Sequence, residues 1–360
     1  MLPKIFLNSL LLLGFTLAGL FTIELGLRYF TGKTYLDVDL RLRNGELVYE
    51  PNQVQRWKRI EWDVTYKINS KGFRDFEYPQ PSRNALVILG DSFTEGYGVE
   101  QFSAFPKELE RLLKPEQPPY RVYNAGLQGR LLRSYLRIYD QFFKNEKGLQ
   151  LVLMGFCIAM DIESESRIQS RTVTVVKKSS LLYPIKRYLC EHSVLYNFIR
   201  RPARLSQTAT HWLSAMGIMG AGPGGDFLAY DEKFLPAWKH TAEIIDDFNV
   251  QLRKEGREFV LLLIPSHDQV YDVHFKQLKK YSGQKFDPFV FNEFMAVFCR
   301  QRGIKLLDLA PALKQAALKQ PDINLYFKTD GHWTAQGHAV VAAAIHRYLK
   351  ANALLRPRLN

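Results

Sequence analysis

The sequence predicts an α/β protein built on a parallel sheet, and three observations support this. Short apolar runs rich in β-branched residues recur along the chain, as is typical of strands buried on both faces. Segments with apolar residues at helical spacing separate these runs. The two patterns alternate, which favours a parallel sheet with helices on both faces and right-handed crossovers.

The elements follow in order along the chain. The predicted strands are 85–89, 121–126, 149–156, 258–264 and 304–307. The predicted helices are about 104–113, 132–144, 238–252, 288–302 and 339–349. The alternation is interrupted at about 162–232, which we interpret as a mostly helical insertion that forms a lid or a substrate-facing wall. We divide the chain into an anchor at 1–30, a linker and lead-in strand at 31–83, and a sheet domain at 84–352.

The amino-terminal segment is long and apolar enough to cross a membrane as one helix. Few polar residues interrupt the run from Ile5 to Ile23. No small-residue cleavage site follows, so we expect an uncleaved transmembrane anchor, with a cleaved signal peptide as the alternative. Basic residues are more numerous after the run than before it, and by this count alone the large domain would stay in the cytoplasm.

Composition limits the classes of partner. The chain is 46% hydrophobic and 24% charged, which describes a globular protein with a substantial core. Its net charge of +13 could favour anionic polysaccharide, phospholipid head groups or nucleic acid. No nucleic-acid motif accompanies the charge, so we expect no nucleic-acid partner. Three scattered cysteines, Cys157, Cys190 and Cys299, are too few for a metal site or a disulfide framework, and we expect no metal and no cofactor.

A candidate nucleophile follows the first strand. Gly90, Asp91 and Ser92 end the apolar run, so a hydroxyl lies at the carboxyl end of a strand, where open α/β sheets bind their ligands. Gly96 and Gly98 keep the next turn open. Such a sequence is often only a turn, because a serine becomes a nucleophile only if a base can take its proton.

A candidate base lies near the carboxyl terminus. Asp330 and His332 share one loop, which we expect to follow the last strand and to reach the same sheet edge as Ser92. His332 would take the proton of Ser92, and Asp330 would fix the imidazole tautomer and stabilise its positive charge. His267, just after the strand at 258–264, is the alternative base at this edge.

Together these residues resemble the SGNH, or GDSL, hydrolase superfamily. The matching blocks are Gly90, Asp91 and Ser92; Asn124 and Gly126 after the second strand; and Asp330, His332 and Trp333. More narrowly, the chain resembles membrane-anchored bacterial members, which share an apolar amino terminus and a lead-in like Asn69, Gly72, Phe73 and Arg74. The Asp-x-His-Trp ending is also similar to that of enzymes that O-acetylate exopolysaccharides. The resemblance covers roughly residues 65 to 350.

The resemblance implies a flavodoxin-like three-layer sandwich, an acyl-serine intermediate and an oxyanion hole. In the family that hole is built from the serine N–H, a glycine N–H and an asparagine side chain, and Ser92 and Gly126 match the first two. Met160 precedes Asp161 where the family usually has Asn-Asp, so either the third donor is missing or Asn124 replaces it. Loss of one such donor typically costs about 100- to 1000-fold in turnover.

Several of these residues also have structural interpretations. Asp91 would bond loop amides as an Asx turn does, and Asp161 would cap a helix rather than touch substrate. Asn124 and Gly126 would only form the tight turn at the end of their strand, with no role in an oxyanion hole. We expect His338 to have a packing or helix-capping role. For Arg74 we favour a salt bridge that holds the lead-in over an anion contact near the site.

The resemblance favours a membrane-anchored serine esterase or O-acyltransferase whose domain faces the periplasm or exterior. It would act on acyl esters, chiefly acetyl groups, of envelope or exported polysaccharide. One alternative is a non-catalytic carbohydrate-binding or assembly protein with a degenerate site, and another is a lipase or thioesterase. The acceptor, water or a sugar hydroxyl, stays open because the same triad serves both.

Overall fold

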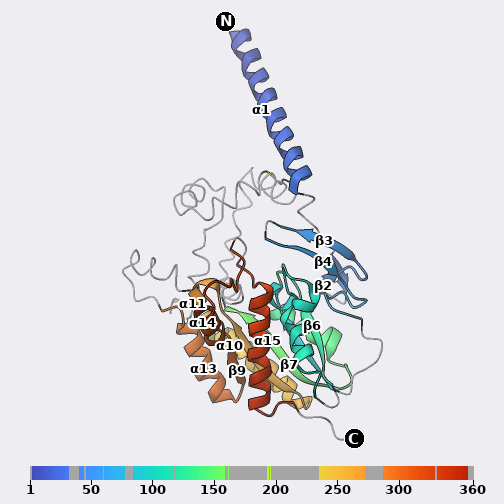
Figure 1. The fold of residues 1–360 in the computed structure, drawn as a ribbon, viewed down its shortest axis with the longest axis vertical. Helices are drawn as coiled ribbons and strands as arrows, with labels where there is room; N and C mark the ends of the chain where they lie inside the picture. The colour runs from blue at the N-terminus through green and yellow to red at the C-terminus, as the bar shows by residue number, and fades with distance from the viewer. Residues whose placement is uncertain are drawn as a thin grey trace. The chain divides into compact units, whose positions relative to one another are not determined.

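A computed structural model describes most of the sheet domain and the amino-terminal helix (Figure 1). The described residues are 2–31, 40–43, 46–59, 61–77, 84–116, 119–158, 161, 193, 195, 235–271, 287–328 and 331–355. The predicted insertion at about 162–232 lies outside them, apart from Ser193 and Leu195.

The core is a five-stranded sheet in the order β6-β5-β7-β8-β9. Its strands are β5 (Ala85–Gly90), β6 (Arg121–Gly126), β7 (Leu149–Cys157), β8 (Glu258–Ile264) and β9 (Lys305–Asp308). Every adjacent pair is parallel. β5 is buried along its whole length, as its uninterrupted apolar sequence predicts. The parallel α/β fold expected from the sequence is confirmed.

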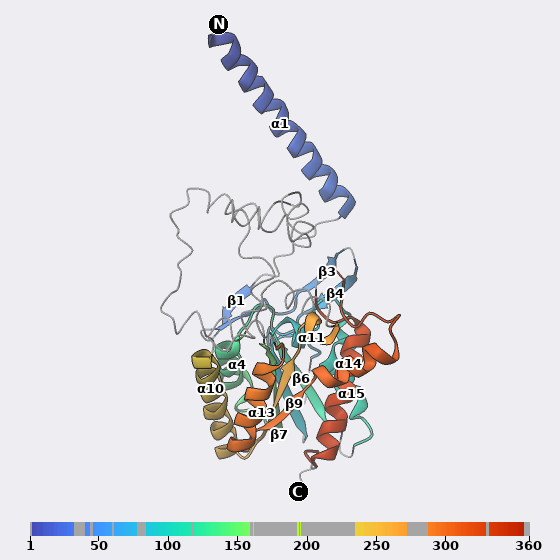
Figure 2. The ribbon, with the colours of Figure 1, turned by 90° about the vertical axis from the view of Figure 1, so that its left-hand side faces the viewer.

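Helices cover both faces of this sheet, which gives three layers. In Figure 2, α10 and α13 lie on one side of the strands and α14 and α15 on the other. The helices are α2 (Ser92–Glu95), α3 (Phe105–Leu112), α4 (Leu132–Ile138), α10 (Leu235–Lys254), α11 (His267–Tyr271), α13 (Val290–Arg302), α14 (Ala310–Lys319) and α15 (Ala335–Ala351). A short 3-10 turn, η1 (Gln101–Ser103), precedes α3.

Side-chain alternation along the strands divides the core between the two faces. Leu86 and Ile88 of β5 pack in one cluster with Phe105 of α3 and Ile345 of α15. The strand residues between them point to the opposite face, because successive side chains of a strand alternate. β5 therefore contributes to two apolar layers, and this is why its sequence is apolar without interruption.

Two predicted elements differ from the structure. The helix expected at 132–144 ends as α4 at Ile138 and continues as one π-helical turn, η2 (Tyr139–Phe143). The loop that carries His332 does not follow the last strand directly, because α14 lies between them. The small residues of α14 at 310–317 gave no strong helical period in the sequence.

The lead-in contains two hairpins where a single strand was expected. β1 (Leu40–Arg43) pairs antiparallel with β2 (Glu46–Tyr49). β3 (Val54–Lys58) forms a second two-stranded sheet with β4 (Asp63–Lys67). In β4 the buried side chains alternate with exposed or half-buried ones, which is the pattern of a strand with one face on the core.

The amino-terminal segment forms one long helix, α1 (Leu2–Thr31). Within it, Asn8–Tyr29 is long and apolar enough to cross a membrane. Contacts divide the chain into two compact units, and α1 belongs to the smaller, which comprises 1–37, 57–60 and 174–223. Within that unit the Glu24 carboxylate accepts hydrogen bonds from Ser193 Oγ at 2.9 Å and from the Leu195 amide at 2.8 Å.

Candidate active site

The turn after β5 presents Ser92 as the first residue of a one-turn helix. Asp91 is the N-cap of α2, and its carboxylate accepts a hydrogen bond from the Phe93 amide at 3.0 Å. Gly96 ends the helix with φ of 86°, a left-handed conformation that favours glycine. Asp91 therefore has the capping contact that its Asx-turn interpretation describes, and α2 holds Ser92 at the carboxyl edge of the sheet.

A tight loop before α15 positions His332. The Phe327 amide donates to the His332 carbonyl at 2.8 Å, and the Thr334 amide donates to the Leu325 carbonyl at 2.9 Å. Trp333 is fully buried, and its ring centroid lies 4.7 Å from that of Phe93 in α2. The tryptophan of the Asp-x-His-Trp ending thus anchors the loop in the core beside the turn that carries Ser92.

Ser92 and His332 meet although they are 240 positions apart in sequence. Ser92 Oγ lies 2.8 Å from His332 Nε2. The imidazole ring packs against Phe93 at a centroid distance of 4.8 Å and against Tyr97 at 4.6 Å. This is hydrogen-bond distance for a nucleophile and its general base, and the aromatic neighbours limit rotation of the imidazole.

Two predicted site residues, Asp330 and Met160, lie outside the described residues. The orienting role of Asp330 therefore stays a prediction, and so does the missing donor at Met160.

Asn124 and Gly126 bond to one another at the end of β6. The Gly126 amide donates to Asn124 Oδ1 at 3.0 Å, and Asn124 Nδ2 donates to the Glu95 carbonyl at 3.3 Å. Both residues are buried. These bonds match the strand-exit interpretation, and in this geometry both groups are engaged within the protein. Their role in an oxyanion hole stays a prediction.

Gly126 also has no room for a side chain. A Cβ at this position would lie 2.2 Å from the Glu95 nitrogen and 2.6 Å from the Thr94 carbonyl carbon. Only glycine lets the end of β6 approach α2 this closely.

Asp161 joins two segments of the chain. Its carboxylate accepts hydrogen bonds from the amide of Leu132, the first residue of α4, and from the amide of Cys157, each at 2.9 Å. This agrees with the helix-cap interpretation. Burial raises the pKa of Asp161 well above its usual range, and the nearby Asp91 adds to that shift. Burial also raises the pKa of Asp91 to about 6.

The other candidate residues have structural contacts. His338 Nδ1 accepts from the Phe105 amide at 3.2 Å, so this buried histidine caps α3 from α15. His267 contacts Asp268 at 3.3 Å and packs on Tyr271. Arg74 is fully buried and donates to the backbone carbonyls of the turn after α2, which agrees with a holding role but through carbonyls rather than the expected salt bridge.

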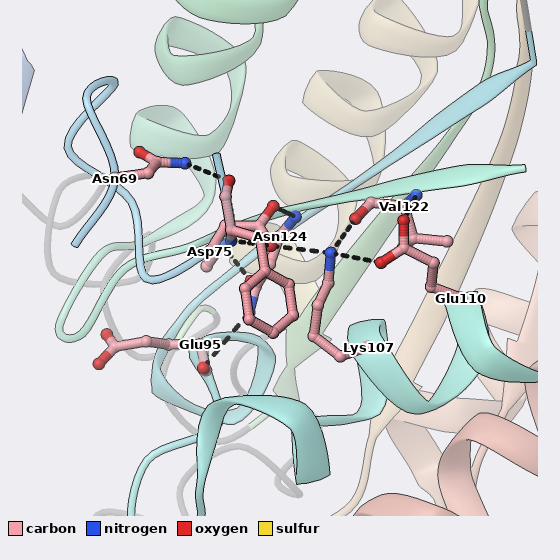
Figure 3. Close-up of polar contacts among 9 residues, drawn as sticks. Asn69, Asp75, Glu95, Lys107, Glu110, Val122 and Asn124 are labelled. Carbon is pink, nitrogen blue, oxygen red and sulfur yellow. Dashed lines mark hydrogen bonds and ion pairs between the residues drawn. The ribbon is translucent and has the colours of Figure 1, made fainter. Parts of the chain in front are cut away.

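Sequence reasoning assigned no role to three buried charged residues near the site: Asp75, Glu95 and Lys107. Lys107 Nζ lies 2.8 Å from Asp75 Oδ1 and 2.9 Å from Glu110 Oε2, as Figure 3 shows. The available signal was a charged residue, Glu95, three positions after Ser92. Within the described ranges, no group of three His, Cys, Asp or Glu side chains is placed to hold a metal ion.

Residues 226–358 match a protein-family model described as an SGNH hydrolase-like domain of the acetyltransferase AlgX. The predicted SGNH resemblance is confirmed. The match includes the His332 loop, while Ser92 lies before it. No curated protein matches the chain.

Solved structures show a distant likeness to this chain. A lipolytic protein of the G-D-S-L family from Desulfitobacterium hafniense DCB-2 is 14% identical with a TM-score of 0.39, over 74% of this chain and 99% of that one. An acetyl-xylooligosaccharide esterase mutant from Geobacillus is 13% identical with a TM-score of 0.41, over 75% of this chain and 95% of that one. Likeness at this level says nothing about activity.

Proposed function

We propose that this protein is a serine esterase or O-acyltransferase that works through an acyl-serine intermediate. The observation that carries the proposal is the 2.8 Å contact between Ser92 Oγ and His332 Nε2. A serine held this way at the carboxyl edge of a parallel sheet is suited to attack an ester carbonyl while its proton passes to the imidazole.

The proposed reaction has two halves. Ser92 Oγ bonds to the ester carbonyl carbon, its proton moves to His332 Nε2, and the alcohol leaves with that proton. Water or a sugar hydroxyl then attacks the acyl-serine, gives its proton to His332 and restores Ser92. The Ser92 amide is the proposed donor to the oxyanion, because it lies in the first turn of α2, where backbone amides have no acceptor within the helix.

Substrate and location complete the proposal. The match to a domain described as belonging to an acetyltransferase supports acetyl esters as the substrate class. We infer an envelope or exported polysaccharide as their carrier from the resemblance of the Asp-x-His-Trp ending. α1 is long and apolar enough to serve as a single-pass anchor. We place the catalytic domain on the extracytoplasmic side, where such a polysaccharide is accessible, against the count of basic residues after α1.

The first test is turnover of p-nitrophenyl acetate by the full-length protein in detergent, compared with Ser92→Ala. We expect turnover by the wild type and its loss in the variant. If the folded wild type is no faster than Ser92→Ala, the hydrolase hypothesis is refuted. Acyl transfer to a specific sugar, or a binding role, would then be the hypotheses left.

The engaged amides of Asn124 and Gly126 favour a second candidate, a carbohydrate-binding or assembly protein with a degenerate site. Met160→Asn separates the two. A gain of about 100-fold in turnover would mean that the native oxyanion hole lacks a donor. If the wild type is active and Met160→Asn shows no gain in turnover, another group already donates to the oxyanion.

A further inference from the structure

Glu95, the last residue of the nucleophile helix α2, is a charged side chain with no exposed surface. Its Oε2 accepts hydrogen bonds from Tyr49 Oη at 2.8 Å and from the Gln128 amide at 2.7 Å. Tyr49 ends strand β2 of the lead-in, and Gln128 lies in the loop after β6. One carboxylate therefore joins the nucleophile helix to two other segments of the chain.

Two donors facing one oxygen suit an ionised carboxylate, and a buried carboxylate needs such partners. Burial raises the pKa of Glu95, and the guanidinium of Arg74 opposes that shift. Arg74 is also fully buried, and its guanidinium carbon lies 3.8 Å from the centre of the Tyr66 ring. The lead-in thus supplies a positive charge beside Glu95 as well as the hydroxyl of Tyr49.

Arg74 holds the turn that leaves α2. Its two terminal nitrogens donate to the carbonyls of Gly96 and Val99, each at 2.5 Å. Gly96 is the C-cap of α2. Because Tyr97 in the same turn packs against His332, movement of this turn would disturb the base as well as the nucleophile.

The adjacent lead-in residue reaches the end of β6. Asp75 Oδ2 accepts from the Asn124 amide at 2.8 Å, and the Asn124 side chain donates in turn to the Glu95 carbonyl at 3.3 Å (Figure 3). Arg74 and Asp75 therefore fix both sides of the contact between α2 and β6.

We propose that Glu95 is a positioning residue for the Ser92 and His332 pair, and that Tyr49 and Arg74 make the lead-in part of the catalytic scaffold. This inference rests on the proposed function, since its readouts are reactions of Ser92. Glu95 does not touch substrate in this scheme. Its charge sets the distance between α2, the loop after β6 and the lead-in.

The test variant is Tyr49→Phe, which removes one hydroxyl and keeps the ring. The matched control is Tyr123→Phe, which removes a similar bond, Tyr123 Oη to Glu146 Oε1 at 2.7 Å. Glu146 precedes β7, at the opposite edge of the sheet from Ser92. Glu95→Gln is the second variant, because it removes the charge while its amide oxygen can still accept hydrogen bonds from Tyr49 and the Gln128 amide.

Three quantities are measured on the full-length proteins: kcat and KM for p-nitrophenyl acetate, the rate of Ser92 labelling by a fluorophosphonate, and the thermal unfolding temperature. We expect Tyr49→Phe to lower kcat and the labelling rate about 10-fold at an unchanged KM, and Glu95→Gln to lower them about 100-fold. Tyr123→Phe should react like the wild type, with an unfolding temperature close to that of Tyr49→Phe.

The outcomes separate this inference from the function on which it rests. If the wild type neither turns over acetate nor labels at Ser92, the proposed function fails and the inference fails with it. If the wild type reacts but Tyr49→Phe and Glu95→Gln react equally fast, the function stands and the positioning role is refuted. If Tyr123→Phe, at a similar unfolding temperature, loses rate as much as Tyr49→Phe does, the positioning role is also refuted, because the rate would then follow the stability of the fold.

Discussion

Replacement of Gly126 by alanine tests the close contact between the end of β6 and α2, the helix that begins at Ser92. The new Cβ would lie 2.2 Å from the Glu95 nitrogen and 2.6 Å from the Thr94 carbonyl carbon. Both atoms belong to the backbone, so no side-chain rotation can relieve the overlap. Relief to an ordinary contact requires β6 and α2 to separate by about 1 Å.

The expected cost follows from that displacement. Overpacking a well-packed site typically costs about 1 to 3 kcal/mol, and a clash with two backbone atoms belongs at the upper end. For a domain of this size, about 3 kcal/mol corresponds to a fall of roughly 6 °C or more in unfolding temperature. A shift of about 1 Å at a reacting group can lower turnover on the order of 100-fold.

The assay is thermal unfolding followed by tryptophan fluorescence, together with p-nitrophenyl acetate turnover. Gly256→Ala is the control, because φ at Gly256 is +69° and an added Cβ there meets nothing within 4 Å. It should lose about 1 kcal/mol from backbone strain alone and keep its turnover. If Gly126→Ala is as stable and as active as Gly256→Ala, the contact with α2 does not position Ser92.

Three further predictions concern buried charges and the triad. Burial lowers the pKa of His338 to about 3, while the unfolded imidazole titrates near 6.5. The unfolded chain therefore binds more protons between these values, and His338 makes stability fall as pH falls through this range, by up to about 1.4 kcal/mol per pH unit. His338→Gln should remove this contribution, so the stability difference from wild type should change between pH 7.5 and pH 5; a constant difference would contradict the buried neutral imidazole. Lys107→Met should cost about 3 to 5 kcal/mol by leaving the Asp75 carboxylate buried without its cation. Denaturant unfolding should show partial recovery when Asp75→Asn is added, and additive losses would argue against coupling. Asp330→Asn should lower kcat on the order of 10⁴-fold if Asp330 orients His332, and a loss below 10-fold would assign that role elsewhere.

The strands were predictable because their physical signal is local. β6 and β8 have the predicted bounds, and β5 differs by one residue, since a strand buried on both faces must be apolar at every position. Ser92 and His332 could also be named from their positions after a strand and in the carboxyl-terminal loop. α14 and the two lead-in hairpins were missed because their sequences have weak periodicity and are stabilised by the surfaces they cover.

The sequence by itself therefore determined the parallel sheet, the apolar amino-terminal helix and the chemical identity of the candidate nucleophile and base. Only the tertiary structure decided what surrounds them. It bonds the Gly126 amide to Asn124, and it buries Glu95 between Tyr49 and Gln128. Apolar periodicity can be read from neighbouring residues, but a buried carboxylate is stable only where distant segments bring their donors to it, and the sequence does not record which segments meet.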